Sequence, residues 1–190
     1  MIIFLILAGS FLFFAHSASA ATYYVRADGT ATKANAIGPD TSTTTTMSMV
    51  AFNAATFSTG DTIYFSDKGG NYSTGMVVPS SGASTSSVIT YSNAPGESPV
   101  IVTSPGGAGI TIGTGKSNVI VTGFTAGQAA TGNGNGVIIA STTNITLSYI
   151  TVPLSHYGIN IQGVSPDTII LDHITVVNED YGYDLYDFAT

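Results

Sequence analysis

The residues best able to do chemistry lie near the end of the chain, where acidic side chains gather after residue 170. The acids expected on the outer surface there are Asp172, Glu179, Asp180 and Asp184. Because Ca²⁺ takes six to eight oxygen ligands, carboxylates on successive strands could hold it. The sequence therefore predicts, at most, a weak calcium site, and the competing interpretation is acid that only keeps the surface soluble.

A second set of polar side chains occupies alternate positions in the same region. Its members are Asn160, Gln162, Asp184 and Tyr186. Alternation along a strand places them on one side, which we expect to face outward. Amide, carboxylate and phenol groups can bond to sugar hydroxyls, so these four are the candidate substrate-binding residues.

Repeated strand units must position these residues. Segments that begin with glycine and continue as a short strand recur every 22 to 27 residues, at Gly109, Gly136, Gly158 and Gly182. A second strand follows each of the first three, at residues 118–125, 144–151 and 168–175. Short strands at a near-constant period predict an all-β, stacked β-solenoid. The pattern also predicts a further second strand after Gly182, so we expect a solenoid that is incomplete at its C-terminal end.

Alternation within the repeats predicts which side chains point inward. The second strands give the columns Val119–Ile145–Ile169, Val121–Leu147–Leu171 and Phe124–Ile150–Ile174, and the first strands give Ile110–Val137–Ile159–Tyr183 and Ile112–Ile139–Ile161–Leu185. The third column follows a break in strict alternation, which predicts a bend. The same alignment places Asp172 outward in column with Ser148, and His173 in column with Tyr149.

Two further residue types recur at fixed places in the repeat. Asn118 and Asn144 align before the second strand, where stacked amides can hydrogen-bond along the solenoid axis. The repeated glycines are interpreted as turn residues with special backbone angles.

The N-terminal residues divide into a leader and a cap. Residues 1–20 combine an apolar run with a small-residue cleavage signal, so they predict a signal peptide and a secreted or periplasmic protein. Residues 21–190 are predicted to form one β-solenoid domain, made of an N-terminal cap and the first coils. The spacing of Met49, Phe52 and Phe57 after Ser48 predicts a short helix that covers the first coil, with Ser48 as its cap.

Composition limits the partners. The net charge is −7, with four Lys and Arg against eleven Asp and Glu, which argues against nucleic acid and anionic membranes. The absence of cysteine excludes a disulfide framework, so packing must stabilise the exported domain. We expect a monomer that does not bind membranes once the leader is removed.

Three motifs together resemble a known superfamily. They are Tyr-Tyr-Val-Arg-Ala-Asp-Gly at residues 23–29, the short helix before Gly-Asp-Thr-Ile-Tyr-Phe at 60–65, and the turns and strands of residues 79–101. This lead-in resembles the secreted right-handed parallel β-helix proteins of the pectate-lyase-like superfamily. The stretch from Ser80 to Phe124 is most similar to the chondroitinase-B and alginate-lyase branch. The resemblance implies a right-handed parallel β-helix, three sheets per coil and polysaccharide as the ligand.

The resemblance does not extend to an active site. Lyases of this superfamily use a Lys or Arg base beside Ca²⁺ or another charge-neutralising group, yet no basic residue follows Lys116, which lies in a turn. The Asp-Asp and Gly-His-Gly strings of the related galacturonan hydrolases are also absent. Catalytic residues are therefore unknown. We expect a protein that binds or processes extracellular polysaccharide, lyase-like or glycosidase-like, with its active site beyond residue 190. The alternative is a non-catalytic structural, adhesive or carbohydrate-binding β-helix.

Overall fold

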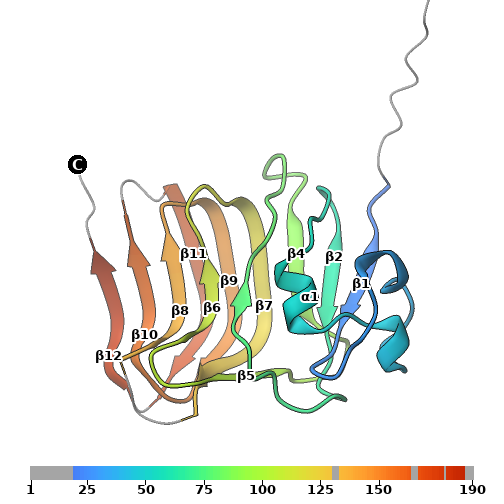
Figure 1. Ribbon diagram of the computed structural model, residues 1–190. Helices are drawn as coiled ribbons and strands as arrows, with labels where there is room; N and C mark the ends of the chain where they lie inside the picture. The colour runs from blue at the N-terminus through green and yellow to red at the C-terminus, as the bar shows by residue number, and fades with distance from the viewer. Residues whose placement is uncertain (1–18, 130–132, 164–166, 178, 187–190) are drawn as a thin grey trace, which may run out of the picture.

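The computed structural model is a β-solenoid of stacked parallel strands with very little helix, which confirms the predicted all-β class (Figure 1). It describes residues 19–129, 133–163, 167–177 and 179–186. Every pairing between its named strands is parallel. The predicted leader, residues 1–20, lies almost wholly outside the described residues.

The strands form two sheets that run the length of the solenoid. In spatial order the first contains β1 (Thr22–Val25), β2 (Thr62–Phe65), β4 (Ile89–Asn93), β7 (Ser117–Gln128), β9 (Thr143–Val152) and β11 (Asp167–Val176), and β5 (Val100–Thr103) also pairs with β7. The second contains β3 (Met76–Val77), β6 (Ala108–Ile112), β8 (Asn135–Ala140), β10 (Ser155–Gln162) and β12 (Glu179–Tyr186). Each sheet grows by one strand per coil.

The long strands of the first sheet bend, so each coil presents three faces. The first half of β7 pairs with β4 and its second half pairs with β5. The bend falls at Gly123, Tyr149 and His173, whose φ angles are 82°, 52° and 51°. A residue in this left-handed region turns the chain without breaking the ladder. The positive φ explains why the alternation of inward and outward side chains breaks at these positions.

The strand register confirms the columns predicted from alternation, and their described side chains are buried or partly buried; the side chains of Tyr183 and Leu185 lie outside the described part. Val121 pairs with Leu147 and Leu147 with Leu171, and the other predicted columns pair in the same way. Leu147 is fully buried, as are Val121 and Ile145. The core is therefore a set of like residues stacked from coil to coil.

The predicted short helix is present, and it lies at the edge of the second sheet. Helix α1 (Met49–Asn53) begins after Ser48, whose hydroxyl accepts a hydrogen bond from the Ala51 amide at 3.2 Å. The side-chain amide of Asn53 donates to the Gly75 carbonyl and accepts from the Val77 amide, both at 2.9 Å. These bonds satisfy backbone groups of the edge strand β3 that would otherwise be unpaired.

The asparagine ladder is confirmed. The Asn144 amide donates to the Asn118 side-chain oxygen at 3.2 Å, and the Asn118 amide donates to the Gly82 carbonyl at 3.2 Å. Both residues have positive φ, as does Thr168 at the same place in the next coil. Asparagine tolerates this conformation better than most residues, so the column serves both the turn and the stacking.

The repeated glycines are not turn residues with special backbone angles, so that interpretation is wrong. Gly109, Gly136 and Gly158 lie inside strands β6, β8 and β10 and do not have positive φ. A Cβ atom on Gly136 would meet the Val152 side chain and would come within 2.6 Å of the Gly158 carbonyl oxygen. These positions require glycine because neighbouring chain segments approach closely.

An ionic cluster joins the N-terminal cap to the first coils. The Lys68 ammonium lies 2.8 Å from an oxygen of Asp40 and 2.8 Å from an oxygen of Glu97. Burial alone would raise the pKa of Asp40, but hydrogen bonds with Glu97, Lys68 and Ser66 outweigh it and lower the pKa to about 2. Because the folded pKa is below the unfolded value, the charged carboxylate stabilises the fold above about pH 4. That contribution is lost as the pH falls from about 4 to about 2.

Asp40→Asn should therefore lower the melting temperature at neutral pH but not at pH 2. A lost contribution of about 1 kcal/mol, after allowance for solvent screening, corresponds to roughly 2–4 °C. Melting curves of both proteins between pH 7 and pH 2 measure the difference. Asp28→Asn is the matched control, because Asp28 also pairs with a cation but its side chain is 47% exposed. An Asp40→Asn difference that stayed constant down to pH 2 would contradict this account.

Candidate functional site

The best candidate for a binding surface lies on the outside of the bend in the first sheet. Ser92 pairs with Thr122, Thr122 with Ser148, and Ser148 with Asp172. The residues that follow them in sequence form a second column, at the bend itself: Asn93, Gly123, Tyr149 and His173. We call this column the bend row. It runs across four successive coils.

Two exposed aromatic rings stack in the bend row. The Tyr149 and His173 rings lie 4.6 Å apart between centroids with an interplanar angle of 16°. Tyr149 is 60% exposed, which is unusual for so large an apolar ring. Positive φ is rare for a bulky residue and costs free energy. The predicted stacking of His173 after Tyr149 is confirmed, and the rings form a platform open to solvent.

A hollow of about 240 Å³ lies beside this platform. Its lining residues are mostly polar: Asn93, Glu97, Ser98, Gly123, Phe124, Thr125, Tyr149 and Thr151. Gly123 opens the hollow, because a Cβ atom there would collide with the Asn93 side chain. The Asn93 amide is fixed by donating to the Glu97 carbonyl at 2.8 Å.

Hydroxyl groups flank the bend row on both sides. Before the bend, the Ser148 hydroxyl donates to the Thr122 hydroxyl at 2.8 Å, and Asp172 continues the column. After the bend, Thr125, Thr151 and Thr175 are paired across successive strands. The surface can therefore donate and accept hydrogen bonds at each coil.

Both carboxylates at this surface have partners within the fold. Glu97 lines the hollow, with one carboxylate oxygen 2.8 Å from Lys68 and the other accepting from the Asp67 amide at 2.9 Å. Asp172 lies 2.7 Å from Nδ1 of His173. Sequence reasoning missed Glu97 and Asn93, since nothing local in the sequence links them to Tyr149.

The residues predicted to bind sugar lie elsewhere, on the second sheet. Asn160 and Gln162 belong to β10 and pair with Asp184 and Tyr186 of β12. Asn160 is only 7% exposed, and Gln162 is half-buried with its backbone oxygen bonded to the Ser141 amide. The side chains of Asp184 and Tyr186 are outside the described part. The backbone thus brings the four into adjacent columns, away from the bend row.

The predicted calcium ligands come from both sheets. Asp172 is on β11 in the first sheet, whereas Glu179, Asp180 and Asp184 are on β12 in the second. Of these four, only the Asp172 side chain is described, and its neighbour is His173. Among the side chains that the structure describes, no group of three His, Asp or Glu could hold a metal ion. The calcium site stays a prediction.

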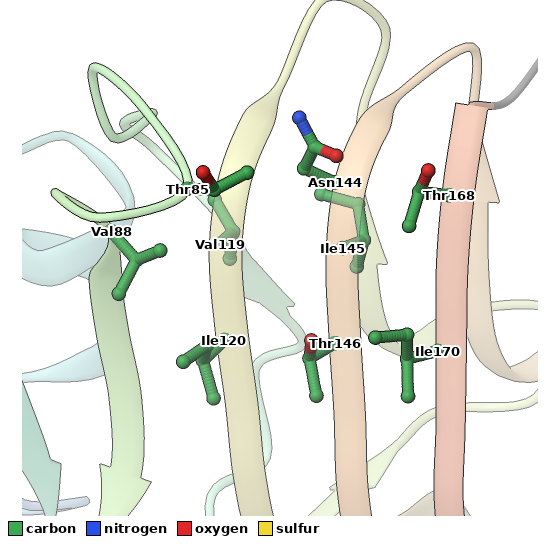
Figure 2. A pocket seen from close by; sticks show the side chains of 9 residues that line it. All are labelled: Thr85, Val88, Val119, Ile120, Asn144, Ile145, Thr146, Thr168 and Ile170. Atoms are coloured by element: carbon green, nitrogen blue, oxygen red, sulfur yellow. The ribbon is translucent and has the colours of Figure 1, made fainter.

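A second, apolar groove of about 230 Å³ lies on the same sheet (Figure 2). An outward column of Ile120, Thr146 and Ile170 forms its floor, and Thr85 and Val88 of the preceding loop form its wall. Ile120 precedes Thr122 by two residues, so the floor lies next to the hydroxyl column.

Comparisons with known proteins return nothing similar. No family model matches the chain, and no curated protein or solved structure matches it. Within the described ranges, no helix is long and apolar enough to span a membrane.

Proposed function

We propose that this protein binds an extracellular polysaccharide along the bend row. The observation that carries the proposal is the exposed Tyr149–His173 stack beside a polar hollow. An aromatic ring packs against the C–H face of a sugar, while hydroxyl and amide groups bond to its hydroxyls. The hydroxyl columns supply such groups at each coil, about 4.8 Å apart, so an extended polymer along the axis would meet the same chemistry repeatedly.

The proposal includes that the protein is exported and that it is a right-handed β-helix of the pectate-lyase-like kind. The leader predicted over residues 1–20 would deliver the domain to the cell exterior or periplasm, where polysaccharides are found. Right-handed winding is the expected handedness for parallel strands joined by crossovers. The pectate-lyase-like resemblance supports polysaccharide as the ligand class, while fold alone does not define an activity.

Binding is favoured over catalysis by this chain's own residues. A lyase needs a base near the abstracted proton and a group that neutralises the neighbouring carboxylate. Lys68 pairs with Glu97, which lines the hollow, and also with Asp40. A lyase-like or glycosidase-like activity would thus depend on residues other than those of the bend row.

Tyr149→Ala should weaken polysaccharide binding at least tenfold. The substitution removes the exposed ring and leaves the hydroxyl columns in place. Affinity electrophoresis and calorimetry against a panel of soluble polysaccharides measure the change. Tyr24→Ala is the control, because Tyr24 lies on β1, far along the solenoid from β9. Equal affinity for the wild type and Tyr149→Ala, with both folded, would refute the proposal.

A further inference from the structure

We infer that the polysaccharide bound along the bend row is uncharged; this inference rests on the proposed function. The bend row and the neighbouring apolar groove together offer aromatic, hydroxyl and aliphatic contacts. Among the described residues, no Lys or Arg lines the hollow or the groove, and the one carboxylate that lines the hollow, Glu97, is paired with Lys68.

Each of the four Lys and Arg residues has a partner within the fold. Arg26 pairs with Asp28 at 2.9 Å, and Lys68 lies between Asp40 and Glu97. The remaining two lysines donate to backbone carbonyls: Lys33 to Thr56, and Lys116 to Pro79 at 2.7 Å. A polyanionic chain in the hollow would therefore have to compete with Asp40 and Glu97 for Lys68.

The acidic residues near the bend row also disfavour a polyanion. Asp172 is exposed and would repel a polyanion, in a chain whose net charge is −7. A cationic amino sugar would need an unpaired carboxylate in the hollow. The Glu97 carboxylate, however, is bonded through both oxygens, to Lys68 and to the Asp67 amide.

The apolar groove supports the same conclusion. Its floor column is Ile120, Thr146 and Ile170 (Figure 2). Each of these residues lies two positions before a member of the hydroxyl column on the same strand, so both columns face the same outward side. Ile170 is 51% exposed there, and no charged residue lines the groove. An uncharged polymer can cover this surface with the C–H faces of its rings, because it carries no charge that contact with isoleucine would desolvate.

Binding of three soluble polymers tests the inference: a neutral β-glucan, polygalacturonate and chitosan. Each is titrated at low and high salt against the wild type, Tyr149→Ala and Ile170→Asp. We expect the neutral polymer to bind with an affinity that changes less than twofold with salt. Both substitutions should weaken it at least tenfold. Ile37→Asp is the matched control, because Ile37 is 64% exposed in the N-terminal cap, and it should change nothing.

The outcomes separate the inference from the proposed function. Binding of polygalacturonate or chitosan that depends on Tyr149, without binding of the neutral polymer, would overturn the inference and leave the proposed function standing. Failure of all three polymers to bind, or binding that is unchanged in Tyr149→Ala, would overturn both. Neutral-polymer binding that is unchanged in Ile170→Asp would remove the apolar groove from the site and overturn the inference as stated.

Discussion

Leu147→Asp is expected to destabilise the fold by about 4 kcal/mol or more, because it places a carboxylate in the solenoid core without a partner. Leu147 is fully buried between Val121 and Leu171 of the adjacent coils. For a domain of this size such a loss lowers the melting temperature by at least about 10 °C. Circular dichroism during heating measures it.

Thr146→Asp provides the matched control for this substitution. Thr146 is the preceding residue on β9 and faces outward between Ile120 and Ile170. A carboxylate there stays in contact with water, so the melting temperature should change by no more than about 2 °C. Similar losses at both positions would mean that alternation along β9 does not separate core from surface.

Gly136→Val should destabilise the protein by about 3 kcal/mol, through crowding and not through lost burial. Any Cβ atom at this position meets the Val152 side chain and lies 2.6 Å from the Gly158 carbonyl oxygen. The backbone of the adjacent coil cannot withdraw without lengthening ladder hydrogen bonds. Chemical denaturation measures the change in free energy of unfolding.

Gly113→Val separates crowding from a general cost of replacing glycine. A Cβ atom on Gly113 would meet nothing within 4 Å, and its φ is not in the positive range. This variant should remain within about 0.5 kcal/mol of the wild type. A large loss at Gly113, or none at Gly136, would show that close approach of the coils is not what selects glycine.

The core could be predicted from the sequence because two periodicities agree. Alternation assigns Val121 to the inside, and the repeat length places Leu147 and Leu171 beside it in the next coils. A shift of one residue would expose all three, so the register is strongly specified. The bend was also visible, since alternation fails at Gly123 and at the two residues aligned with it.

The candidate site was harder to predict because it depends on backbone geometry and distant segments. Alignment put Tyr149 and His173 in one column, but the sequence displays neither their positive φ nor their exposure. The Glu97–Lys68 pair joins two loops that no repeat relates. Asn160 alternates outward with Ile159 and Ile161, yet it is buried, so alternation alone overestimates how much of a strand contacts solvent.

The constant spacing of paired strands also has a consequence for how the chain folds. Val121 and Leu147 are 26 residues apart, and Leu147 and Leu171 are 24 apart, whereas the cap pair Tyr23 and Ile63 is 40 apart. Closing the longer loop costs only about 0.5 kcal/mol more in chain entropy. Successive ladders therefore have nearly equal closure costs, and none is entropically much easier to start than another. Folding speed is then governed by the first two coils to associate, after which each further coil adds to an existing template at a rate that does not depend on the length of the solenoid.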